Sequence, residues 1–163
     1  MMTSADAKAF ARLHHAGQLD ETGQPYIEHL ERVTFAAERR AQHAMNAGLQ
    51  VQLDQVTQAA WLHDVVENSP ITAAELRTAG FAEPVVAMIE LLTRPKGQAT
   101  YEEAAAKIIE SDNLGAILIA LSDNEDNASP DQPLQPASTL PARYAASMAR
   151  LRKAAEALGY DDL

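Results

Sequence analysis

Two residue types that commonly bind metal ions, His63 and Asp64, stand side by side inside an apolar stretch of the chain. A helix that follows Asp54 must end at Ser69, because the next residue is a proline. In such a helix, His63 and Glu67 are one turn apart and share a face. Apolar side chains occupy the opposite arc, which predicts a central helix with one buried face and one polar edge. A core helix whose polar edge simply faces solvent would show the same pattern, so the interpretation depends on residues elsewhere.

The composition indicates a mainly helical protein of one domain. The chain has 163 residues, of which 47% are hydrophobic and 22% are charged, as is usual for a globular domain. Alanine, leucine, glutamate and glutamine are plentiful while runs of β-branched residues are short, which favours helices. The chain has no cysteine, and this excludes disulfides, cysteine-ligated metals and thiol nucleophiles.

The charge and hydropathy of the chain restrict its partners. The net charge is −10, and so acidic a surface repels a phosphate backbone, which argues against DNA or RNA polymers. A small nucleotide stays compatible, because a bound divalent cation can reverse the field inside a pocket. Residues 1–8 contain no signal-peptide core and no apolar run reaches membrane-spanning length, so we expect a cytoplasmic protein with no membrane partner. The sequence does not indicate an oligomeric state.

The most apolar segment of the chain also ends in a carboxylate. Residues 117–121 form an apolar run that is too continuous for a surface helix, and Asp123 follows it inside a helix predicted over 113–127. A carboxylate at such a place is costly unless something pairs with it. The next segment, 128–141, holds four of the eight prolines and is predicted to be a loop, followed by a last helix over about 141–158.

Four potential metal ligands stand in order along the chain: His29, His63, Asp64 and Asp123. A divalent cation between them would neutralise both carboxylates and leave coordination positions for water and substrate. Mixed imidazole and carboxylate ligands suit Mn²⁺, Fe²⁺, Co²⁺ or Zn²⁺ better than Ca²⁺. Taken singly, each histidine is better explained as an ordinary core or surface residue, so the ordered set carries the prediction.

This ordered set resembles the HD superfamily of metal-dependent phosphohydrolases. The details are similar to the hydrolase domain of RelA/SpoT proteins and to the small alarmone hydrolases. The matching segments are 15–18, 23–29, 59–67, 91–94 and 121–127, which together span about residues 5–130. The most specific pieces are Pro-Tyr-Ile-x-His, at 25–29, and Leu-His-Asp-x-x-Glu, at 62–67.

The resemblance implies a fold and a set of roles. The fold would be all-α, a single-domain HD-type helical bundle over residues 1–163 around one metal site, with a core over about 5–130 and a C-terminal helix over about 141–158. The metal would be one divalent ion, Mn²⁺ in the first place, bound by His29, His63, Asp64 and Asp123. The reaction would be hydrolytic removal of phosphate or pyrophosphate from a nucleotide, as in (p)ppGpp 3′-pyrophosphohydrolysis. Glu67 would orient or activate the attacking water, and Asn127 would contact the nucleotide.

Three departures from the family pattern affect the substrate rather than the metal. Asn68 stands in the catalytic pair with Glu67 where the family has an aspartate, and an amide can orient water but cannot accept its proton. Asp20 and Glu21 occupy the turn where alarmone hydrolases place a basic residue, and Ala120 stands where they have a lysine before the last metal ligand. Candidate replacements for these substrate contacts are Arg94, Lys96, Lys107, Arg143 and Tyr144, although each also fits an ordinary surface or core role.

Three functions therefore remain open from the sequence. The first is a metal-dependent nucleotide phosphohydrolase of the alarmone-hydrolase type, or a close relative with altered nucleotide specificity. The second is a weakly active or inactive nucleotide-binding module that keeps the metal pocket. The third is an HD 5′-nucleotidase, which would release orthophosphate and no pyrophosphate.

Overall fold

The computed structural model describes residues 1–94, 100–128 and 140–163, and the fold across these residues is all-α, as predicted. Within them no strand is present, and one isolated β-bridge joins Leu19 to Pro25. No helix in these segments is both long enough and apolar enough to cross a membrane. The helices are α1 (Ser4–His14), α2 (Tyr26–Asn46), α3 (Leu53–Leu62), α4 (Val65–Asn68), α5 (Ala73–Ala79), α6 (Glu83–Leu92), α7 (Tyr101–Glu110), α8 (Leu114–Asn127) and α9 (Leu140–Ala157).

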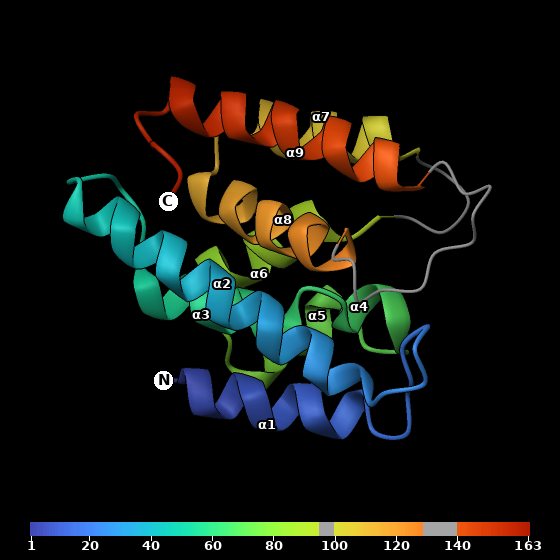
Figure 1. The fold of residues 1–163 in the computed structure, drawn as a ribbon. Coiled ribbons are helices and arrows are strands. Elements are labelled where there is room, and N and C mark those ends of the chain that lie inside the picture. The colour runs from blue at the N-terminus through green and yellow to red at the C-terminus, as the bar shows by residue number, and fades with distance from the viewer. Residues whose placement is uncertain (95–99, 129–139) are drawn as a thin grey trace.

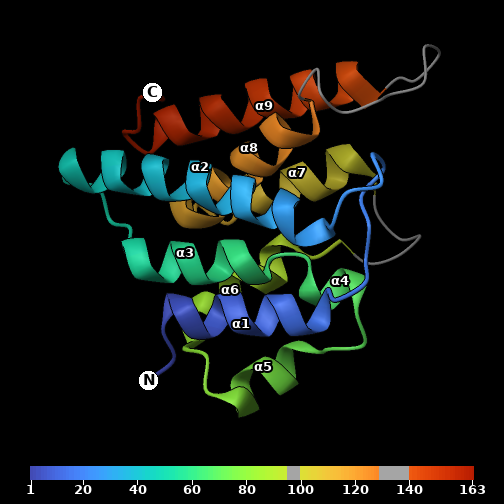
Figure 2. The same cartoon turned by 60° about the horizontal axis from the view of Figure 1, so that its bottom comes forward.

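The helices stack side by side around a shared apolar core (Figures 1 and 2). Helix α1 lies along α3, α3 lies along α2, α2 lies along α8, and α8 lies along α9. The predicted buried helix is α8, whose residues from Leu114 to Ser122 are all buried. Its start is fixed by Asn113, whose side chain accepts a hydrogen bond from the backbone of Ala116 at 3.0 Å. The predicted C-terminal helix is α9.

A glycine allows α8 to approach its neighbours closely. A β-carbon at Gly115 would lie 2.7 Å from the sulfur of Met88 in α6 and 3.2 Å from a methyl group of Val56 in α3. A β-carbon there would require the Met88 side chain to move and Val56 to shift slightly, so glycine fits this contact without adjustment. This packing sets the position of α8 relative to α3, and therefore the position of Asp123 relative to His63.

The predicted central helix is wrong in one respect, because it is interrupted at the pair His63-Asp64. Helix α3 ends at Leu62, and α4 begins at Val65. The side chain of His63 forms a hydrogen bond with the carbonyl of Ala60 at 2.6 Å, which competes with continued helical pairing of that carbonyl. Asp64 has φ −102° and ψ −1°, well away from the ideal helical values of about −63° and −42°. The pair His63-Asp64 thus lies at a junction rather than on a continuous helix face.

The C-terminal segment is tied to the bundle by a buried arginine, Arg40 of α2. Its guanidinium donates to Ser122 at 2.9 Å, to Glu125 at 2.8 Å and to Asp162 at 3.0 Å. Asp162 also accepts from the hydroxyl of Tyr160 at 2.9 Å. This cluster joins α2, α8 and the residues after α9, directly beside the helical turn that carries Asp123.

Candidate metal centre

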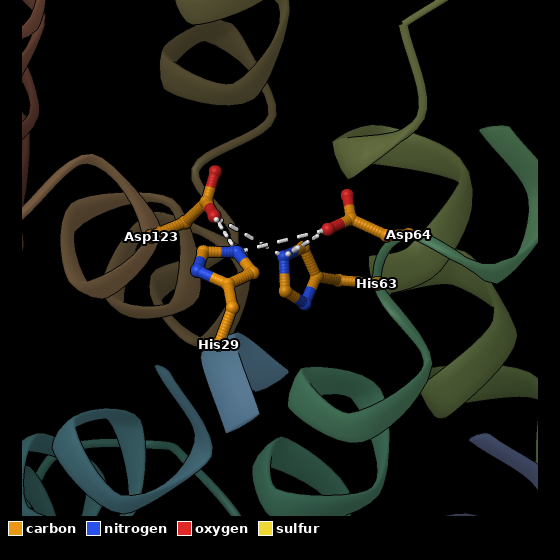
Figure 3. Close-up of side chains that lie close together, drawn as sticks. All are labelled: His29, His63, Asp64 and Asp123. Atoms are coloured by element: carbon orange, nitrogen blue, oxygen red, sulfur yellow. Dashed lines mark hydrogen bonds and ion pairs between the residues drawn. The ribbon is translucent and has the colours of Figure 1, made fainter. Parts of the chain in front are cut away.

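Three parts of the fold bring the four predicted ligands together. His29 lies in the first turns of α2, His63 and Asp64 lie at the junction of α3 and α4, and Asp123 lies near the end of α8. Figure 3 shows the four side chains pointing toward one another. One potential ligand atom from each residue lies within 4.8 Å of all the others. Residues that are far apart in the sequence therefore form one compact group that could hold a metal ion.

The closest approaches join histidine nitrogens to carboxylate oxygens. Nε2 of His29 lies 3.1 Å from Oδ1 of Asp123 and 3.9 Å from Oδ2 of Asp64. Nε2 of His63 lies 3.1 Å from Oδ2 of Asp64 and 3.4 Å from Oδ1 of Asp123. Two nitrogens and two oxygens thus face one small space, the donor set that first-row divalent metals bind in proteins.

The second nitrogen of each ring has a partner outside this space. Nδ1 of His29 pairs with Oδ2 of Asp126 at 2.6 Å, and Nδ1 of His63 pairs with the Ala60 carbonyl at 2.6 Å. Because both partners are acceptors, each Nδ1 carries a hydrogen, so loss of the proton on Nε2 would leave a neutral ring whose Nε2 lone pair points inward. Metal-binding histidines are oriented in this way, so the residues fit a divalent cation.

The charges of the cluster also fit a cation. Burial lowers the pKa of His29, but the hydrogen bonds with Asp123 and Asp126 outweigh it and raise the pKa to about 9. Burial raises the pKa of Asp123, but the hydrogen bonds from the two histidines reverse this and hold that pKa well below its usual value. Without a metal, the two carboxylates thus draw protons onto the histidines. A divalent cation would supply the same positive charge and release these protons.

Two residues that the sequence prediction missed hold the ligands in place. The hydroxyl of Tyr26 donates to Oδ2 of Asp64. Asp126 accepts from His29 and also from Arg32, whose Nε lies 2.7 Å and whose terminal nitrogen lies 3.1 Å from its two oxygens. Helical spacing could have indicated both, since Tyr26 precedes His29 by three residues and Asp126 follows Asp123 by three.

Replacing Asp126 by asparagine is expected to weaken Mn²⁺ binding by about 10- to 100-fold, because His29 then loses the carboxylate that orients its ring. The matched variant Arg32→Met removes only the partner of Asp126, so its loss should be no more than a few-fold. Equilibrium titration of the metal-free proteins with Mn²⁺ measures both. An Asp126→Asn protein with unchanged affinity would show that Asp126 does not position the ligand.

The four clustered residues line a pocket of about 440 Å³. Glu67 and Asn68 line the same pocket although the helix break separates them from His63. Oε1 of Glu67 accepts a hydrogen bond from the backbone of Arg94 at 2.7 Å, and burial raises the pKa of this carboxyl group. The side chain of Asn68 donates to the hydroxyl of Tyr26 at 3.5 Å.

The predicted substrate contacts divide into three groups. Arg94, Asn127 and Tyr144 line the pocket, although Tyr144 is also largely buried. Arg143 is exposed above the ring of Tyr101 and does not line the pocket, and neither does Lys107, whose ammonium donates to the Glu90 carbonyl. Lys96 lies outside the described residues.

Comparison with known proteins identifies the fold. No family model and no curated protein sequence matches the chain. Among solved structures, the chain is similar to a metazoan orthologue of SpoT that hydrolyses ppGpp and plays a role in starvation responses, with a TM-score of 0.64 and 21% identity over 95% of this chain and 92% of that chain. At this identity the likeness establishes the fold alone. The fold is therefore the HD-type helical bundle that the sequence predicted.

Proposed function

We propose that this protein is a metal-dependent phosphohydrolase that acts on a nucleotide. The observation that carries the proposal is the convergence of His29, His63, Asp64 and Asp123 in a pocket large enough for a nucleoside. These four residues are the proposed ligands of one divalent metal, with Mn²⁺ first and Fe²⁺, Co²⁺ or Zn²⁺ as alternatives. The similarity in fold to a ppGpp hydrolase supports this proposed function.

The proposed reaction is the attack of water on phosphorus. A bound divalent cation lowers the pKa of water and polarises the phosphoryl oxygen. Glu67 accepts the proton of the attacking water at Oε2, since Oε1 is already held by the Arg94 backbone. The water oxygen bonds to phosphorus, the bond between phosphorus and the leaving oxygen breaks, and solvent protonates the product. Arg94 and Asn127 are positioned in the pocket to contact the phosphate and the nucleoside.

The test of this assignment is the Glu67→Gln variant. We expect kcat to fall by about 100- to 10,000-fold, because an amide cannot accept the proton of water. Metal affinity should change little, since Glu67 is not among the four clustered residues. Phosphate release and Mn²⁺ titration on the same preparation separate the two effects. Unchanged turnover in Glu67→Gln would remove Glu67 from the proposed mechanism.

Two further functions remain as candidates. A change at position 68 tests the first, and the released product tests the second. Asn68 lines the pocket beside Glu67 but cannot accept a proton, which favours a weakly active nucleotide-binding module as the second candidate. A large gain in hydrolysis rate in Asn68→Asp would support this weakly active module, because the aspartate would restore a missing proton acceptor. An unchanged rate would favour an enzyme that works with asparagine at this position. An HD 5′-nucleotidase would release orthophosphate from a 5′-monophosphate without any pyrophosphate.

A more specific proposal is that the substrate is the alarmone (p)ppGpp. A (p)ppGpp 3′-pyrophosphohydrolase would have to accept phosphates on both sides of the ribose. The pocket wall carries Asp20, Glu21 and Ala120 at the places where the sequence departs from alarmone hydrolases. A close relative with altered nucleotide specificity therefore agrees with these side chains better than a (p)ppGpp hydrolase does.

A further inference from the structure

We propose that the pocket selects nucleotides that carry phosphate only at the end bound by the metal cluster, with an uncharged nucleoside beyond it. This inference rests on the proposed function and narrows its substrate class. Nucleotides with phosphate at one end of the ribose are then preferred over nucleotides with phosphates at both the 5′ and the 3′ positions.

The charges that line the pocket are mostly negative. The described lining includes five carboxylates, those of Asp20, Glu21, Asp64, Glu67 and Asp123. Among the same lining residues, Arg94 is the only arginine or lysine. A divalent cation would balance two carboxylates and bind one phosphate group, with Arg94 as a second partner. Among the described lining residues, no further lysine or arginine is present to pair with a second phosphate.

Segments 95–99 and 129–139 lie outside the described residues, and by sequence they contain one lysine, Lys96, and one aspartate, Asp131. Arg143 interacts with the face of Tyr101, with 5.9 Å between its guanidinium carbon and the ring centre, and does not line the pocket.

The negative side of the pocket is built into a turn. Oδ1 of Asp20 accepts hydrogen bonds from the backbone of Thr22 at 2.8 Å, from its hydroxyl at 2.6 Å and from the backbone of Gln24 at 3.0 Å. The carboxylate of Asp20 is thus fixed where the turn meets the pocket, and Glu21 follows it as an exposed residue. A distal phosphate near this turn would meet like charge, which disfavours binding.

Other residues of the pocket lining suit a base and a sugar. Tyr101 and Tyr144 both line the pocket, and Tyr144 is largely buried. The rings of Tyr101 and Tyr144 pack edge to face, with centroids 5.9 Å apart. Small and apolar side chains belong to the same lining: Ala104, Ala105, Ile108, Ala120 and Leu151. Such a surface can stack or enclose a neutral nucleoside.

The test compares matched nucleotides on the Mn²⁺-loaded protein. The pairs are AMP with adenosine 3′,5′-bisphosphate, and GMP with guanosine 3′,5′-bisphosphate. We expect kcat/KM for the singly phosphorylated member to be higher by about tenfold or more, and the preference to shrink at high salt because the acidic turn is accessible to ions. Equal or faster hydrolysis of the bisphosphates would overturn the inference.

A charge-changing variant locates the source of the preference. Asp20→Asn combined with Glu21→Lys keeps an oxygen that can accept the turn hydrogen bonds and adds positive charge. This double variant should lower the preference ratio by about fivefold or more, whereas Glu110→Lys with Glu156→Lys, a similar charge change at exposed residues outside the pocket, should leave it unchanged. An unchanged ratio in the first variant would contradict the inference.

Binding separates the failure of this inference from the failure of the proposed function. The affinities of the same nucleotide pairs are measured by calorimetry on metal-loaded Glu67→Gln protein. If the unmodified protein hydrolyses no nucleotide but the singly phosphorylated members bind more tightly to the Glu67→Gln protein, the proposed function fails and the selectivity stands. Equal or tighter binding of the bisphosphates overturns the selectivity, whatever the activity.

Discussion

The Asp123→Asn variant is expected to lose metal-dependent turnover by at least about 1,000-fold, roughly 4 kcal/mol of transition-state stabilisation. Oδ1 of Asp123 lies close to the Nε2 atoms of both His29 and His63, at 3.1 and 3.4 Å. Asparagine keeps the shape of the side chain but removes the charge that a divalent cation needs. Phosphate release and Mn²⁺ content are measured together on the purified protein.

The matched control for Asp123 is Glu125→Gln. Glu125 lies two residues further along α8, is half-exposed and contacts Arg40 rather than a histidine. Its amide variant should retain metal and activity within about twofold, as for a change at a solvent-accessible ion pair. An Asp123→Asn protein that keeps both full metal content and full turnover would contradict the assignment of Asp123 as a ligand.

Arg40→Met is expected to be the most destabilising change outside the metal centre, at about 3 kcal/mol of unfolding free energy. The buried guanidinium contacts Ser122, Glu125 and Asp162, and a methionine would leave the partly buried Asp162 without this partner. The control is Arg152→Met, which removes an exposed partner of the same Asp162 and should cost less than about 1 kcal/mol. Urea unfolding of the metal-free proteins measures both.

The stability loss in Arg40→Met should depend on pH, because Asp162 is titratable. Burial raises the pKa of its carboxyl group, but the hydrogen bond from Arg40 outweighs burial and holds the pKa at about 2, below the ordinary value of 3.8. A lowered pKa stabilises the fold above the ordinary value, and this stabilisation is lost as the pH falls through about 2. The difference in unfolding free energy between Arg40→Met and the unmodified protein should therefore decrease as the pH is lowered from 4 to 2. Equal stability losses in the two arginine variants at neutral pH would contradict the structural role of Arg40.

The sequence predicted the helical fold and the set of clustered residues because both depend on local patterns. The apolar run of α8 and the prolines before α9 mark elements by their order along the chain. His63 and Asp64 are adjacent, and His29 and Asp123 each stand at a recognisable place in a helix. The structure brings these four side chains together, while their roles as ligands remain a prediction.

The features that the sequence did not predict depend on contacts between distant segments. Asp126 pairs with His29 across 97 residues, and its spacing from Asp123 indicates a shared helix face but not that His29 lies against that face. The break between α3 and α4 depends on the ring of His63 bonding to the Ala60 carbonyl, which periodicity does not reveal. Helix α1 packs through Ala7 and Ala11, while the side chain of Leu13 is 70% exposed.

The most direct test of the central claim is hydrolysis of a nucleotide panel by one preparation of protein, metal-free and after loading with Mn²⁺. The panel contains ppGpp, pppGpp, ppApp, their singly phosphorylated relatives and common mononucleotides, with orthophosphate and pyrophosphate both quantified. We expect hydrolysis of at least one nucleotide after loading and none in the metal-free protein. Hydrolysis that persists without metal would contradict the proposed metal dependence. The absence of hydrolysis of every nucleotide in the panel, with Mn²⁺ demonstrably bound, would contradict the proposed activity.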